Sequence, residues 1–335
     1  MSSYISNTLA GLLALFPSRK RKRNAPKSVV DIAKMVEHVV EVVDPRIRVI
    51  GRYAKKITPP LAHTWDYLTD IANVIPGGVT LSRATFSSDP RIKLIISSLN
   101  EIQQLLETIN PLIEDKRHIK GNTPSHVYML LCMEKNEHNF LGAELAGDII
   151  KRDVMQTRVT FFNHKFLSAG YTEEDAKQGF KKCALEGLLL KAHDLVMQSH
   201  NEQKQLIERK KQLHQQLHTK HDSPFRQPGG LFSRNDYLVD APPELLDIER
   251  QLTEIRIRSE SPDHHLSKTI EILNNPEQYL KVERQSVMLN NFGIKIQGDA
   301  MKNQFNIEYA EVEIEQALKH VTMIVSGAVE EIFYH

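Results

Sequence analysis

Residues 172–219 read TEEDAKQGFKKCALEGLLLKAHDLVMQSHNEQKQLIERKKQLHQQLHT and carry the longest periodic signal in the chain. Thr172-Glu173-Glu174 is a typical helix start, because a capping hydroxyl is followed by acids in the first turn. Gaps of four and three alternate between Leu185, Leu189, Ala192, Val196, Ser199, Gln203, Leu206, Lys210, Leu213 and Leu217. This heptad spacing predicts a helix to about Thr219, with a seam that is apolar at both ends and polar in its middle.

A second, shorter seam follows Pro242-Pro243 and consists of Leu245, Ile248, Leu252 and Ile255. The residues between the two seams, 222–243, are punctuated by Pro, Gly and Asp and predict a loop. Two heptad helices joined by a loop can fold back antiparallel and cover each other's seam. We therefore predict an antiparallel coiled-coil hairpin over residues 171–261. Its uncovered apolar positions are available to a protein partner or to a second copy of the chain, and they are Leu206, Leu213, Leu217, Leu245 and Leu252.

Residues 28–170 predict an N-terminal helical domain. The motif Asp-Pro-Arg-Ile occurs at 44–47 and again at 89–92, and each copy favours a helix start with Asp as the N-cap. An internal duplication is the alternative explanation of the repeat, and Pro59-Pro60 is expected to end a helix. Further helices are predicted at residues 99–113, 125–133 and 142–153, and a strand at residues 156–162.

Residues 262–335 begin with one short predicted helix and then show the alternation typical of strands. Phe305, Ile307 and Tyr309 alternate with polar residues, which is typical of a strand with one buried face. The fold class predicted for the whole chain is therefore mainly α, with a small antiparallel β-meander at the C-terminus (α+β).

The first 27 residues are set apart by charge. They contain six cations and no acid, and the cations Arg19, Lys20, Arg21, Lys22 and Arg23 are consecutive. Before them, Ile5, Leu9, Leu12, Leu13 and Phe16 fall at helical spacing. The apolar run is too short for a spanning helix and its charges follow it, unlike those of a signal peptide. Three interpretations of this segment remain open. It binds an anionic membrane surface, it is a solvated tail, or it docks onto the protein itself.

Composition excludes several function classes. The 335 residues suggest roughly two domains. With 43 cations and 42 acids, the net charge of the chain is too small to attract nucleic acid to the protein as a whole. Aromatic residues make up 7% of the chain and do not interleave with basic ones over any domain-sized stretch, so sequence-specific nucleic-acid binding is not expected. Phosphate-binding glycine loops, the G-x-S-x-G elbow and H-E-x-x-H are all absent, and the sequence identifies no cofactor.

Two polar clusters are candidate chemical sites. His214, His218 and His221 share a helical face and could bind Zn²⁺ or Ni²⁺, although a solvated helix end explains them equally. Glu144 and Asp148 are four residues apart and would share a helical face, with His138 in the loop before them, and the three could perform acid–base chemistry or hold a divalent cation. Helix-dipole and i, i+4 pairing account for the same acids without any catalysis.

The dipeptides of Ile75-Pro76-Gly77-Gly78, Ser87-Ser88-Asp89-Pro90, Leu141-Gly142-Ala143-Glu144 and Gly147-Asp148 resemble uncharacterised bacterial cytoplasmic proteins of unknown function. The resemblance implies a bacterial cytoplasm and no particular activity. Two widely spaced cysteines, Cys132 and Cys183, agree with a reducing compartment. We expect a non-catalytic interaction or scaffold protein that uses its hairpin, in the cytoplasm or at the inner face of the membrane. The alternative is an enzyme built on Glu144, Asp148 and His138.

Overall fold

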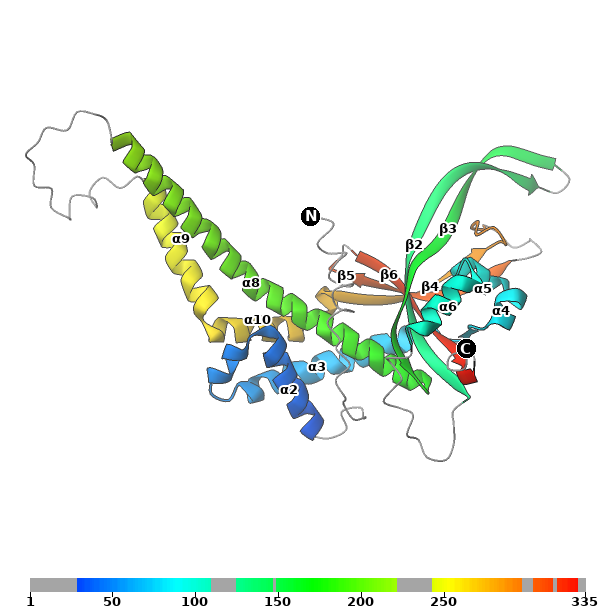
Figure 1. Ribbon diagram of the computed structural model, residues 1–335, viewed down its shortest axis with the longest axis horizontal. Helices are drawn as coiled ribbons and strands as arrows, with labels where there is room; N and C mark the ends of the chain where they lie inside the picture. The colour runs from blue at the N-terminus through cyan, green and yellow to red at the C-terminus, as the bar shows by residue number, and fades with distance from the viewer. Residues whose placement is uncertain are drawn as a thin grey trace, which may run out of the picture. The chain divides into compact units, whose positions relative to one another are not determined.

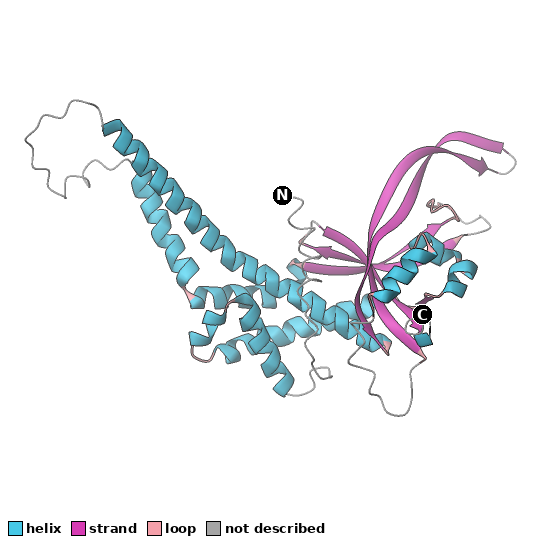
Figure 2. Ribbon diagram, viewed as in Figure 1, coloured by secondary structure: helices cyan, strands magenta, loops and turns pink. Residues whose placement is uncertain are grey.

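The structure is a computed structural model that describes residues 29–109, 125–146, 149–221, 243–296, 304–315 and 318–330. Figure 1 traces its elements and Figure 2 separates helices from strands. The helices are α2 (Val29–Val43), η1 (Pro45–Val49), α3 (Tyr53–Val74), α4 (Arg83–Ser88), α5 (Pro90–Ile95), α6 (Leu99–Glu107), α8 (Glu173–His221), α9 (Pro243–Glu260), α10 (Pro262–Asn274) and η4 (Pro276–Gln278). The strands are β1 (Val79–Thr80), β2 (His126–Ala146), β3 (Ile149–Gly170), β4 (Leu280–Leu289), β5 (Phe305–Ile314) and β6 (Leu318–Ala328).

The described residues divide into two compact units. The first takes its residues from Ala62–Leu188 and Asn275–His335 and holds the β-sheet. The second takes its residues from Ser28–Leu61 and Leu189–Asn274 and is helical. Helices α3 and α8 contribute to both. None of the helices in the described ranges is both long and apolar enough to cross a bilayer.

The sheet of the first unit corrects the predicted fold class. Six strands form it in the order β3-β2-β6-β5-β4, and β1 adds to β6 in parallel. Its two longest strands, β2 and β3, come from the N-terminal half, where helices were predicted at residues 125–133 and 142–153. The protein is therefore not a mainly α chain with a small C-terminal meander. The meander exists as β4, β5 and β6, but it continues a larger sheet.

The physical reason for this error is burial on both faces of β2. Val127, Met129 and Leu131 face one side while Leu130 faces the other, and all four are fully buried. A strand buried on both sides loses its apolar–polar alternation, so its sequence cannot be distinguished from a buried helix by periodicity. Residues 142–153 were predicted to be a helix because they contain the good helix formers Ala, Glu and Leu, although Gly147-Asp148 is a common turn dipeptide. The structure of Gly147-Asp148 lies outside the described residues.

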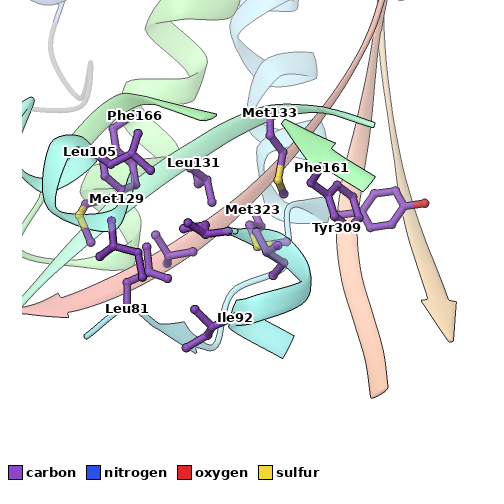
Figure 3. Close-up of a cluster of buried hydrophobic side chains, with 14 of the residues drawn as sticks. Leu81, Ile92, Leu105, Met129, Leu131, Met133, Phe161, Phe166, Tyr309 and Met323 are labelled. Atoms are coloured by element: carbon purple, nitrogen blue, oxygen red, sulfur yellow. The ribbon is translucent and has the colours of Figure 1, made fainter. Parts of the chain in front are cut away.

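One face of the sheet packs against α4, α5 and α6. Figure 3 shows side chains from β2, β3, β5 and β6 gathered with those of the helices. Phe161 and Tyr309 meet edge to face, with ring centroids 6.0 Å apart. These contacts make up the main core of the first unit, which the figure labels at Leu81, Ile92, Leu105, Met129, Leu131, Met133, Phe161, Phe166, Tyr309 and Met323.

Beyond this core, β2 and β3 continue as a two-stranded ribbon (Figure 1). Strand β6 pairs with β2 only from His126 to Met133, whereas β3 accompanies β2 as far as Ala146. Register shifts between Cys132/Glu134 and between Gly142/Glu144 coincide with the positive φ values of Asn163 and Asp153. Such bulges bend a ribbon and strengthen its twist. The far part of the ribbon exposes the cross-strand pair Leu141 and Met155.

The second unit is built around short helix-start motifs and the long helix α8. Asp44 caps η1 by accepting a hydrogen bond from the backbone N–H of Arg46, as the Asp-Pro motif predicts. Helix α10 packs against η1 and α9. The buried apolar side chains include Val39, Val40, Val43, Ile47, Leu189, Ala192, Val196, Leu266 and Leu273.

Candidate functional site

Helices α8 and α9 run antiparallel in the second unit (Figure 1). Arg209 donates to Glu244 at 2.7 Å, and Lys210 forms an ion pair with Glu249 at 2.8 Å. Further along, the hydroxyl of Ser259 donates to the side-chain oxygen of Gln203 at 3.0 Å. Later positions of α8 therefore face earlier positions of α9, which is the pairing of two helices that fold back on each other.

The polar middle of the long seam has a partner in this arrangement. Gln203 lies at the seam position where heptads normally carry an apolar residue, and its partner Ser259 is fully buried. A buried hydroxyl without a hydrogen bond costs free energy. The pair of Gln203 and Ser259 therefore favours this alignment of α9 along α8 over alignments shifted by a turn. The sequence alone indicated the polar position but not its partner.

The two helices leave an open groove of about 510 Å³ between them. Its apolar floor comes from Leu206 of α8 and from Ile248 and Ile255 of α9. The remaining lining side chains are Glu202, Gln205, Arg209, Glu244, Asp247 and Gln251. Two of the three carboxylates on the rim are ion-paired, Glu244 with Arg209 and Asp247 with Arg250.

The predicted interaction residues fall in different environments. Leu206 lines the groove and is half-buried, while Leu245 is buried. Leu213 and Leu252 are half-buried, and the side chain of Leu217 lies outside the described residues. Three large apolar side chains on the hairpin remain more than half exposed, and they are Ile207, Leu246 and Ile257.

The predicted histidine cluster stays on one helix, because α8 reaches His221. His214 is half-buried, and the side chains of His218 and His221 lie outside the described residues. Across the described ranges, no group of three His, Cys, Asp or Glu side chains could hold a metal ion.

The residues of the predicted acid–base site do not share a helix. His138 and Glu144 both lie in β2, opposite Arg158 and Lys151 of β3, and Asp148 lies outside the described residues. Six residues of strand separate His138 from Glu144 by about 20 Å, since a strand rises about 3.3 Å per residue. The premise of that site, one helical face carrying both acids, is wrong.

Two histidine–carboxylate pairs escaped the sequence analysis. His265 and Asp44 meet in the second unit, and His164 and Glu101 meet in the first, each with a 2.6 Å separation between Nδ1 and a carboxylate oxygen. Among the described residues, neither ring has a partner for its buried Nε2 atom. Both rings are almost fully enclosed, so each pair places a hydrogen bond inside the packed interior. Sequence gives no signal for them, because 221 and 63 positions separate the partners.

The cations Arg19, Lys20, Arg21, Lys22 and Arg23 lie outside the described residues. Comparison of the chain with protein-family models, with curated proteins and with solved structures finds no match. The groove between α8 and α9 is therefore judged on its own geometry. It has an apolar floor and a charged rim.

Proposed function

We propose that the protein is a non-catalytic interaction or scaffold protein that binds a protein partner, or a second copy of itself, along the groove between α8 and α9. The observation that supports this proposal is the apolar floor of Leu206, Ile248 and Ile255 beneath a rim of charged side chains. Apolar side chains at the centre of a contact with polar ones around them are typical of protein interfaces. The seam of α8 would continue into such an interface as a coiled coil.

A matched pair of photo-crosslinking residues tests this proposal in cells that express the full chain. Gln205 lines the groove, and Ile207 is exposed on α8 about 200° around the helix from it. We expect the residue at position 205 to give a defined adduct, either a second copy or one protein, at about tenfold the yield at position 207. Asp247→Lys on the opposite rim should reduce that adduct and leave the circular dichroism spectrum unchanged.

Light scattering of the purified chain supplies the second measurement. If the adduct is a second copy, the mass should rise with concentration and fall for Asp247→Lys. Equal crosslinking from positions 205 and 207, together with a monomer at every concentration, would contradict the proposal.

We also propose that the protein works in the cytoplasm. Cys132 and Cys183 are free thiols, and burial raises their pKa values to about 12 and about 11. Cysteines that form no disulfide agree with a reducing compartment. Cell fractionation of the tagged full chain would test this, and recovery outside the cytoplasm would contradict it.

A further inference from the structure

Three histidine rings meet in the second unit, where α8, η1 and α10 come together. His265 of α10 lies between the other two, with its ring centroid 6.1 Å from that of His200 on α8 and 6.3 Å from that of His264 on α10. Asp44, which caps η1, accepts a hydrogen bond from Nδ1 of His265. We propose that these three rings, the histidine latch, hold α10 against α8 and η1 at neutral pH and release it in mild acid. This inference does not depend on whether the groove binds a partner.

The centre of the histidine latch is closed to solvent. The side chain of His265 is 0% exposed, and its Nε2 atom has no hydrogen-bond partner within the described ranges. Asp44 already has a cationic partner, because Nε of Arg46 lies 3.1 Å from its Oδ2 atom. A positive charge added beside His265 is therefore poorly solvated, and such a charge is costly in a protein interior.

His200 is half-buried and has cations from two elements near it. Nη2 of Arg46 lies 3.5 Å from Nε2 of His200, and Lys204 follows one turn later on α8. Burial, Arg46 and the ring of His265 lower the pKa of His200. Lys204 acts in the same direction, and Asp44 opposes it. A proton therefore binds His200 less tightly while the histidine latch is closed.

His264 has a similar environment on the side of α9 and α10. Burial lowers its pKa most, and the ring of His265 comes next. Lys268 of α10 and Arg258 of α9 lower it further, whereas Glu271 raises it. Glu271 is itself paired with Lys268 at 2.7 Å, so its charge is largely balanced. Protonation of His264 therefore also works against the closed latch.

The direction of the pH effect follows from the two lowered pKa values. When α10 is released, the imidazoles return to their ordinary pKa of about 6.5. As the pH falls through that value, the released form binds protons that the closed form does not bind, so acid favours release. Ordinary carboxyl groups titrate about two pH units lower. A change between about pH 7.5 and about pH 5.5 therefore reports mainly on imidazoles.

Hydrogen exchange of the full chain, followed by mass spectrometry, tests the inference. The quantity measured is the protection factor of the backbone amides in α10, which corrects the exchange rate for its intrinsic dependence on pH. We expect this protection to fall about tenfold from pH 7.5 to pH 5.5, because two imidazoles take up protons when α10 is released. The protection of β2 from His126 to Met133, in the first unit, should change by less than about twofold.

Matched variants assign the effect to the histidine latch. His200→Gln combined with His264→Gln removes both titrating rings and should make the protection of α10 nearly independent of pH over this range. His214→Gln is the control, because it removes a half-buried imidazole from α8 outside the latch, and it should keep the tenfold change. If the double variant does not fold, each single variant still tests the inference and should reduce the change to about threefold.

Three results would overturn the inference. The first is equal protection of α10 at the two pH values. The second is an unchanged pH dependence in the variant that lacks both His200 and His264, which would assign the effect to other groups. The third is a parallel loss of protection in α10 and in β2, because the whole chain would then unfold in acid and the effect would not be confined to α10.

Discussion

The Nδ1 atom of His265 lies 2.6 Å from Oδ2 of Asp44, and this hydrogen bond joins residues 221 positions apart. The ring of His265 is completely buried and the carboxylate is 8% exposed. Because a carboxylate can only accept, Nδ1 carries the proton and donates it. Asp44 also accepts from the backbone and side chain of Arg46, so one carboxylate caps η1 and fixes α10 against it.

The two copies of the Asp-Pro-Arg-Ile motif provide a matched test of this contact. Asp44→Ala removes a cap and leaves buried groups without their partner, and we expect a loss of about 3 kcal/mol in the free energy of unfolding. Asp89 caps α5 and pairs with Arg91 in the same way, but its carboxylate is 25% exposed and it has no histidine partner among the described residues. Asp89→Ala should cost about 1 kcal/mol. Urea denaturation measures both, and equal losses would contradict the role of His265.

Acid should destabilise the protein partly through Asp44. Burial on its own raises the pKa of Asp44, but hydrogen bonds from Arg46 and His265 outweigh it and hold the pKa below its ordinary value. A group with a lowered pKa in the folded state stabilises above its unfolded pKa of about 3.9 and loses this contribution as pH falls through the folded value. The urea midpoint should therefore fall below about pH 4, and less steeply in Asp44→Asn. Parallel curves for the two proteins would show that another carboxylate is responsible.

Lys181, unlike Asp44, is a buried group whose charge lowers the stability of the protein. Its side chain is 4% exposed, with Nζ 5.5 Å from the centroid of the Trp65 ring and 3.8 Å from a carboxylate oxygen of Glu174. Burial lowers the pKa of Lys181, with Glu174 opposing it. Between that lowered value and about 10.4 the unfolded chain binds more protons, so this residue makes stability rise with pH.

Lys181→Met should therefore stabilise the protein by about 1 kcal/mol at pH 7, and by less as the pH rises, because deprotonation of the buried amine relieves the cost of burying its charge. The control is Lys177→Met, which breaks the i, i+4 ion pair with Glu173 and should cost about 0.4 kcal/mol. Thermal unfolding at pH 7 and at pH 10 separates them. A similar loss in both variants would mean that the contact with Trp65 outweighs the cost of burying the charge.

The far part of the β2–β3 ribbon should tolerate polar substitution. Leu141 is 63% exposed, and it lies beyond Met133, where the pairing of β2 with β6 ends. Leu141→Ser should change the free energy of unfolding by no more than about 0.5 kcal/mol. Phe161 is on the same ribbon but is buried against Tyr309. Phe161→Ala should therefore lower the free energy of unfolding by about 3 kcal/mol. A large loss for Leu141→Ser in chemical denaturation would reveal a contact that covers the ribbon.

Part of the groove between α8 and α9 could be predicted from the sequence, and part could not. Of the apolar floor, the sequence predicted only Leu206 as an interaction residue, and it placed Ile248 and Ile255 in the shorter seam, because a helix puts every third or fourth residue on one face. The groove itself depends on how far α9 stands from α8, and on which polar side chains take part in cross-helix pairs such as Arg209 with Glu244. Spacing along one chain segment contains no information about that separation.

By itself, the sequence determined the features that local geometry dictates. The helix predicted from Thr172 exists as α8, and Asp44 and Asp89 cap their helices, because each signal lies within a few neighbouring residues. Only the tertiary structure decided that His126–Met133 is a strand, that Pro59 and Pro60 lie inside α3 and do not end it, and that Asp44 meets His265. Those outcomes depend on partners far along the chain: β2 is a strand because β3 and β6 satisfy its backbone hydrogen bonds while side chains cover both of its faces.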